Sequence, residues 1–239
     1  MKKILIIILL STTIFAQSES QIGLIAKFGA AGGFTPVILF PNFDKLTPYN
    51  QKLSMEEFNS PLVAWGGGGY AYVMFIDNLR MGGIGFGGSQ SRTSRINGVN
   101  NEFIYSLGGG GFTIEYTMPF VKNMALSAGF ILGGGSLELN IYENSGSFSW
   151  DNVWSNLPEN SFYSKEISIK NSFLFFSPTV NLDVPITRFL AIRGGLGYQF
   201  TFTNDWTIAN DKELLNIPDG LNGNGLFIQT GILIGLFAF

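Results

Sequence analysis

The sequence has no cysteine and no histidine among its 239 residues. Disulfide scaffolds, metal sites built on Cys or His, and catalysis by imidazole or thiolate are therefore excluded. Charge is scarce as well, because only 13% of the residues are charged, about half the share found in ordinary soluble domains. Apolar runs are too short for a membrane-spanning helix, which needs roughly 18 residues. The apolar excess must therefore be carried by another kind of element.

The first 16 residues have the three parts of a secretory signal peptide. Lys2 and Lys3 form a positive start, residues 4–10 are apolar, and a more polar stretch ends on the small residue Ala16. We expect a signal peptide over residues 1–16 and a mature barrel domain over 17–239. A transmembrane anchor is the alternative, but it needs a longer apolar run. The mature chain would hold 12 basic and 17 acidic residues, which argues against a nucleic-acid partner.

Glycine and phenylalanine are abundant, with 31 and 23 copies, and apolar residues recur with a period of two. This periodicity predicts extended strands. Eight segments follow the pattern, and each is long for a strand of a globular protein. They cover residues 21–34, 62–77, 80–93, 102–118, 123–141, 168–185, 189–203 and 225–239.

The connections between these segments differ in length at the two ends of the strands. Short ones cover residues 78–79, 119–122 and 186–188, whereas 35–60, 142–167 and 204–224 are long and 94–101 is intermediate. Such a pattern is typical of outer-membrane barrels, in which closure pairs every backbone amide. The sequence therefore predicts an all-β protein. Its fold would be an eight-stranded antiparallel up-and-down transmembrane β-barrel with short periplasmic turns and long extracellular loops.

The two faces of the predicted strands differ in chemistry. In the seventh segment Leu190, Ile192, Leu196 and Phe200 alternate with residues such as Arg193, so one face suits lipid and the other a polar lumen. Periodicity alone does not distinguish this arrangement from a soluble barrel with an apolar interior. Aromatic residues at both strand ends favour the bilayer. They are Phe75, Tyr116, Phe120, Phe189, Phe237 and Phe239 at the turn side, and Tyr142, Phe200, Phe202 and Trp206 at the loop side.

The chain ends on a strand that closes with Leu236-Phe237-Ala238-Phe239. In this respect it resembles the small eight-stranded, porin-like outer-membrane β-barrels of Gram-negative-type bacteria. The resemblance implies export to the bacterial outer membrane and contact with its lipid. It also implies that Leu233, Phe237 and Phe239 form the C-terminal signal read by the outer-membrane assembly machinery.

Glycine clusters at residues 66–69, 108–111 and 133–135 lie in the middle of predicted strands. Across two of them the apolar phase changes, for example from Tyr105 and Leu107 to Phe112 and Ile114. We favour β-bulges, which would restore the register and bend the strands. The other interpretation has no bulges, so that the loop-side half turns its apolar side chains inward and forms an apolar cup.

Two sets of luminal residues are candidate sites. Lys27, Glu115, Asp183 and Arg193 fall on the predicted inner face at similar depth, and buried charges need partners. We expect an ion-pair network that closes the turn side, as a structural plug or as a gate. The second set is an apolar lumen that could bind a small hydrophobic molecule or simply pack the barrel. It consists of Ile228, Ile232, Ile234 and Leu236.

No catalytic residues, metal ligands or cofactor site emerge, and enzymes of the resembled family depend on a histidine, so we expect no enzyme. The predicted function is an integral outer-membrane barrel with a structural, surface-interaction or small-solute or hydrophobic-molecule passage role. One alternative is an exported soluble calycin-like barrel with a small apolar ligand. Another is a barrel subunit of a larger cell-envelope assembly.

Overall fold

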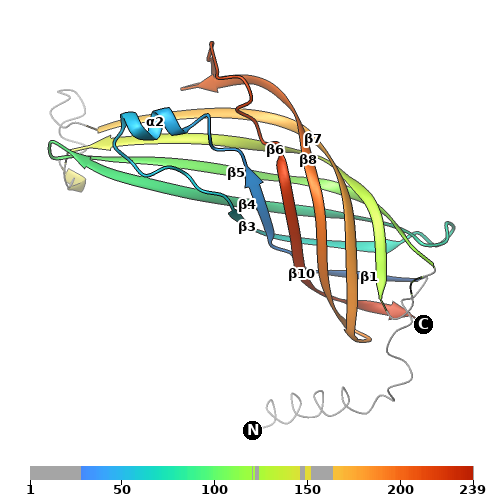
Figure 1. The fold of residues 1–239 in the computed structure, drawn as a ribbon. Helices are drawn as coiled ribbons and strands as arrows, with labels where there is room; N and C mark the ends of the chain where they lie inside the picture. Colours follow the sequence, from blue (N-terminus) through green and yellow to red (C-terminus); the bar gives the residue numbers. More distant parts are fainter. Residues whose placement is uncertain (1–27, 120, 122–123, 146–148, 152–163, 239) are drawn as a thin grey trace, which may run out of the picture.

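Antiparallel strands make up most of the described chain (Figure 1). The computed structural model describes residues 28–119, 121, 124–145, 149–151 and 164–238, so the predicted signal peptide lies outside it. The one helix given bounds there is α2 (Thr47–Lys52). The strands are β1 (Phe28–Phe34), β2 (Val37–Pro41), β3 (Leu62–Tyr72), β4 (Leu79–Ile96), β5 (Val99–Thr117), β6 (Ala125–Asn144), β7 (Ser164–Thr187), β8 (Leu190–Ile208), β9 (Lys212–Glu213) and β10 (Gly225–Ala238).

The sheet closes into a ring of eight strand positions. Neighbouring strands pair antiparallel in chain order from β3 to β8, and β10 pairs with β8. β1 and β2 together fill the position between β10 and β3, and they are interrupted at Thr35 and Pro36, where the proline has no amide hydrogen to donate. The short β9 pairs only with the end of β8. The predicted eight-stranded antiparallel barrel is therefore confirmed.

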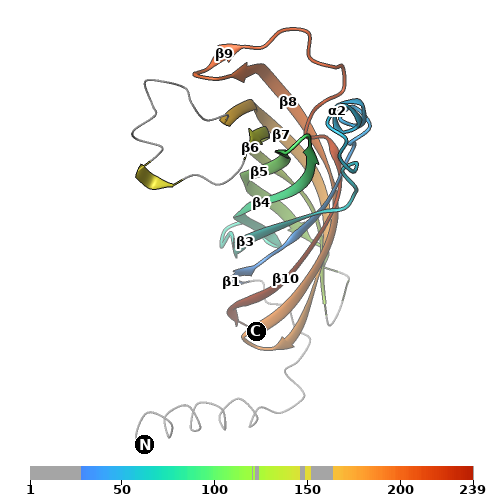
Figure 2. The same cartoon turned by 90° about the vertical axis from the view of Figure 1, so that its left-hand side faces the viewer.

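The two ends of the barrel differ, as the sequence predicts. At the turn end, the connections are residues 73–78, 118–124 and 188–189. At the loop end, residues 42–61, 145–163 and 209–224 form long connections, and α2 lies there across the long strands (Figures 1 and 2). The link between β4 and β5 is tighter than expected. Asn97 and Gly98 both have positive φ, at 52° and 83°, which is the geometry of a two-residue hairpin turn.

Strands β4 to β8 are much longer than the rest of the ring requires. They contain 18 to 24 residues, whereas about 9–11 residues are enough for a strand to cross a bilayer. Figure 1 shows β4 to β7 reaching beyond the compact end of the barrel toward the loop end. Roughly half of each long strand therefore extends beyond the length that a bilayer requires. We call these loop-side parts of β4 to β8 the extension.

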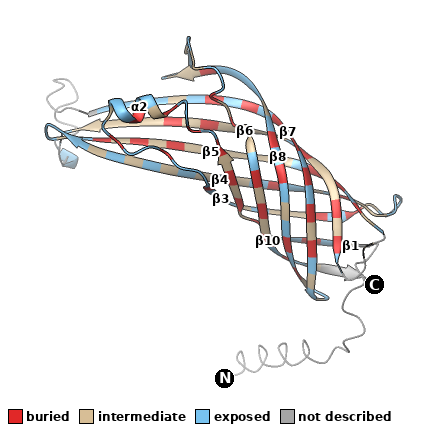
Figure 3. Cartoon of the chain, in the orientation of Figure 1, coloured by how far each residue is buried: buried red, intermediate tan, exposed pale blue. Residues whose placement is uncertain are grey.

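Buried residues alternate with more exposed ones along β4, β5 and β6 (Figure 3). Pairing of β4, β5 and β6 continues through the glycine clusters with no register shift. Tyr105 and Leu107 at the loop end are buried on the same face as Thr113 and Glu115 at the turn end. The predicted bulges at the glycines are therefore wrong, and the inward apolar cup is the arrangement found. The pairing of β7 with β8 does shift register elsewhere, between Asn171 and Phe173 and between Pro185 and Thr187.

The wall exchanges its chemistry at the glycine clusters while the register stays fixed. On the turn side, Phe112, Leu132 and Phe176 point outward and are exposed. On the loop side, the same outward positions carry polar residues such as Ser106 and Ser136. A register change is expected only if the outer wall has one chemistry along its whole length, whereas here the chemistry of the wall itself changes.

Several glycines of the inner wall make room for aromatic rings. A Cβ atom on Gly133 would lie 2.6 Å from Cζ of the Phe175 ring, and one on Gly135 would lie 2.8 Å from the Phe173 ring. Both rings are almost fully buried in the loop-side half. These glycines therefore permit bulky apolar side chains to fill a narrow lumen.

We expect Gly133→Ala to lower the free energy of unfolding by about 1–3 kcal/mol, because the new methyl group meets the backbone carbonyl oxygen of Gly110 as well as the Phe175 ring. Urea unfolding in detergent micelles measures the change. Gly87→Ala is the matched control, since a Cβ atom there meets nothing within 4 Å. Equal stability of the two variants would contradict this account of the inner glycines.

Candidate functional site

Four charged residues meet inside the turn-side half of the barrel. Arg80 from β4, Glu115 from β5, Asp183 from β7 and Arg193 from β8 are each at most 5% exposed. Arg80 donates from Nε to Glu115 Oε2 at 2.6 Å and also bonds Asp183 and Ser127. Two cations and two anions therefore form one neutral cluster, here called the luminal ion cluster.

Arg193 completes the cluster from the opposite side. Its Nε donates to Asp183 Oδ1 at 2.7 Å, and its Nη2 donates to Asp183 Oδ2 at 2.9 Å. Longer bonds of 3.3 and 3.4 Å reach Glu115. The Tyr70 ring lies beneath both guanidinium groups, with its centroid 4.2 Å from Arg80 Cζ and 4.9 Å from Arg193 Cζ. Paired charges stacked on an aromatic ring fill this cross-section of the lumen.

Three of the four residues predicted for this network are brought together by the fold. Lys27 lies outside the described residues, and Arg80 holds the place of the second cation. The sequence contains a signal for Arg80. The distance along the chain from Arg80 to Asn97 equals the distance from Gly98 to Glu115. Recognising the Asn97-Gly98 turn would therefore have placed Arg80 directly opposite Glu115.

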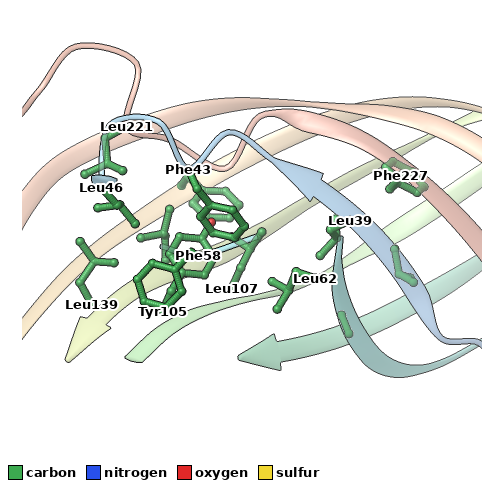
Figure 4. Close-up of a cluster of buried hydrophobic side chains, with 14 of the residues drawn as sticks. Leu39, Phe43, Leu46, Phe58, Leu62, Tyr105, Leu107, Leu139, Leu221 and Phe227 are labelled. Atoms are coloured by element: carbon green, nitrogen blue, oxygen red, sulfur yellow. The ribbon is translucent and has the colours of Figure 1, made fainter. Parts of the chain in front are cut away.

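The loop-side half of the lumen is an apolar cup filled from above by residues 42–61 (Figure 4). Phe43 and Phe58 from this segment pack edge-on against Tyr105 and Phe103, with ring centroids 4.9 and 5.1 Å apart. Leu46 from the same segment is also almost fully buried. We call residues 42–61 the plug segment. It occupies space that an open pore would need.

Side chains on the edge of β4 hold the plug segment in place. Gln90 Nε2 donates to the carbonyl oxygens of Asn59 and Pro61 at 2.7 and 3.1 Å. Arg92 Nε donates to Glu57 O at 2.9 Å, and Ser94 Oγ donates to Leu53 O at 2.7 Å. These bonds tie residues 53–61 of the plug segment to the extension.

Beside the plug segment lies a cavity of about 240 Å³, here called the rim cavity. The plug segment contributes Leu46 and Tyr49 to its lining. The other lining residues come from the ends of β5 to β8 and from the connection that precedes β10. They are Phe103, Leu139, Ile141, Ile169, Trp206, Leu214, Leu215, Asn216, Ile217, Pro218 and Leu221. The lining is overwhelmingly apolar, which is typical of a site for a small hydrophobic molecule.

Trp206 differs from its expected position in an aromatic girdle or an outward-facing loop. It lies in β8, is 7% exposed and packs in the apolar cup. The extension of β8 carries it past the band where an interfacial tryptophan would lie. Among the described residues, no group of three His, Cys, Asp or Glu side chains could hold a metal ion.

Three of the four residues predicted to line an apolar lumen do not do so. Ile232 and Ile234 are 52% and 67% exposed on the outer wall, and Ile228 shares their face. The buried side chains in the described part of β10 are Phe227, Gln229 and Leu233, on the opposite face. Both faces of this strand are apolar, so alternation could not identify the inner one. The side chain of Leu236 lies outside the described set.

The outer wall of the turn-side half is an apolar surface. On β8, Ile192, Leu196 and Phe200 are about half exposed, while Arg193 and Gln199 between them are buried, as the alternation predicts. Neighbouring strands continue the surface, here called the outer band. Its other exposed members include Phe112, Tyr116, Leu132, Leu174, Val180, Phe202, Ile232 and Ile234.

A closed antiparallel sheet with an apolar outer band around a polar lumen is the architecture of outer-membrane β-barrels. The chain has the fold of that superfamily. None of the described helices is long and apolar enough to cross a membrane.

Three of the solved structures that are similar to this chain are those of Ail, CarO and OprG. Ail, the attachment invasion locus protein of Yersinia pestis, in complex with the heparin analogue sucrose octasulfate, is 9% identical, with 89% of this chain and 97% of Ail covered and a TM-score of 0.37. CarO of Acinetobacter baumannii is 10% identical, with 90% and 98% covered and a TM-score of 0.34. The outer membrane protein OprG of Pseudomonas aeruginosa is 11% identical, with 90% and 97% covered and a TM-score of 0.38. No family model and no curated protein matches the chain. The outer-membrane β-barrel architecture of the chain is defined by its closed sheet and its outer band.

Arg80→Met should lower the free energy of unfolding by about 3–5 kcal/mol, because two buried carboxylates are left with one guanidinium. Urea unfolding in detergent measures this loss. Lys170→Met is the control, since Lys170 pairs with Glu138 at 3.2 Å on the exposed wall and should contribute at most about 1 kcal/mol. A similar small effect for both variants would mean that the luminal ion cluster does not support the barrel.

Proposed function

We propose that the chain is an integral outer-membrane β-barrel with a closed lumen, which captures a small apolar molecule in the rim cavity. The single observation that carries this proposal is the rim cavity, about 240 Å³ in volume and lined almost entirely by apolar side chains. It lies at the loop end, beside a plug segment that is itself packed into the apolar cup.

Capture fits the interior better than passage along the barrel axis. The luminal ion cluster lies across the lumen in the turn-side half, and Arg80 at its centre has no exposed surface. The plug segment fills the loop-side half, with Phe43 and Phe58 buried. A solute moving through the barrel would have to displace both, whereas the rim cavity is reached from the loop end.

An exported soluble carrier, the alternative from another class, fits only half of the molecule. The extension does have a calycin-like distribution, with apolar side chains inside and polar ones outside. The turn-side half is reversed, with the outer band exposed and charges inside. Leaving this band in water would be costly, since each exposed apolar side chain loses roughly 1.5–3 kcal/mol of burial. Both surfaces are accommodated if lipid surrounds the turn-side half and water surrounds the extension.

A barrel in the outer membrane also needs an orientation and a route of assembly. We place the turn end in the periplasm and the loop end outside the cell, as is usual for such barrels. Export would use the predicted signal peptide, residues 1–16. Insertion would use the C-terminal signal of Leu233, Phe237 and Phe239. Of these, Leu233 points into the lumen, and Phe239 lies outside the described residues. We propose no catalytic role.

Leu196→Arg should weaken folding into lipid vesicles by about 2–4 kcal/mol, as expected for a cation placed near the centre of the bilayer. The control is Ile104→Arg, because Ile104 lies on the outer face of the extension between Ser91 and Asn140, where we expect water. Urea titration in vesicles measures both. If the two arginines are tolerated equally, the outer band does not face lipid.

A brominated apolar compound such as 1-bromonaphthalene should quench the fluorescence of Trp206 to saturation, because this tryptophan lines the rim cavity. The protein for this titration carries Trp65→Phe, Trp150→Phe and Trp154→Phe. Ile141→Phe should weaken binding at least tenfold by filling the cavity, whereas Ile104→Phe on the outer face should not. Quenching that rises linearly without saturation would count against a built site.

A further inference from the structure

The rim cavity has polar side chains at its mouth as well as apolar walls. Tyr49 on α2 and Asn216 in the connection before β10 both belong to its lining, and both are exposed at the loop end. Trp206, which also lines the cavity, is buried. Tyr49 carries a hydroxyl and Asn216 an amide, so each can both donate and accept a hydrogen bond. The lining can therefore solvate one uncharged polar group close to water.

A charged group would find no such compensation. Among the described residues that line the cavity, none carries a charge. A carboxylate taken from water into an apolar site loses hydration that only a paired cation or several hydrogen bonds can replace. A hydroxyl or carbonyl group has a far smaller hydration to lose, and Tyr49 or Asn216 can satisfy it.

The volume limits the size of the occupant. About 240 Å³ has room for roughly eight to ten non-hydrogen atoms, because each takes at most about the 30 Å³ share of a liquid water molecule and bonded atoms lie closer together than separate waters. A medium-length alkyl chain or a one- or two-ring aromatic fits this space. A long acyl chain of a membrane lipid does not.

We propose that the rim cavity selects neutral amphiphiles of about ten non-hydrogen atoms with a single hydroxyl or carbonyl end, and discriminates against anions of the same length. This rests on the proposed function and specifies its ligand class. Tyr49 and Asn216 are the residues that determine the specificity, and the apolar walls supply the affinity.

The test compares 1-octanol with octanoate at pH 8, each competing with 1-bromonaphthalene for the quenching of Trp206. We expect octanol to displace the probe at a concentration at least tenfold lower than octanoate. Equal displacement by both compounds would overturn the neutral selectivity while leaving the proposed capture of apolar molecules intact. Failure of 1-bromonaphthalene itself to saturate would instead refute the proposed function.

A variant with Tyr49→Phe and Asn216→Gly tests the assignment of the polar end. Glycine is chosen because Asn216 has a φ of 60°, which glycine adopts without strain. We expect octanol to bind three- to tenfold more weakly to this variant, with the affinity for 1-bromonaphthalene unchanged. An unchanged affinity for octanol would overturn the role of these two side chains, and a loss of both ligands would show that they shape the cavity instead.

Discussion

A β-strand that runs from lipid into water must exchange the chemistry of its two faces, because side-chain alternation fixes which residues point outward. Strands β4 to β7 make this exchange without breaking their hydrogen-bond register. The glycine clusters lie at the point of exchange, where neither face carries a side chain that would suit only one solvent. This constraint explains why the lumen is polar in the turn-side half and apolar in the loop-side half. It also determines where each kind of site can form.

Each half of the interior is closed by groups suited to its own wall. The turn-side half receives charges from four separate strands, and they neutralise one another within the luminal ion cluster. The loop-side half receives the plug segment, whose aromatic residues pack against the inward rings of β5. The rim cavity is what remains where the plug segment and the connection before β10 do not fill the cup completely.

Alternation along single strands allowed most of the ring to be predicted, as the match of the seventh segment to β8 shows. It failed where both faces of a strand are apolar, as at Ile232 and Ile234, because only the neighbouring strands decide which face is buried. Arg80 was missed because its pairing with Glu115 depends on the hairpin register rather than on composition. The rim cavity could not be foreseen, since its walls come from connections whose path depends on the finished cup.

The covering of the β4 edge affects how neighbouring molecules behave. In the described part of the chain, β3 pairs with β4 only as far as Gly87, so the rest of β4 forms a sheet edge that projects into water. Unprotected edges of this kind recruit strands from other molecules and lead to aggregation. Here the bonds from Gln90, Arg92 and Ser94 lay the plug segment along that edge. The segment that closes the lumen thereby also runs beside the edge with which a strand from another molecule would have to pair.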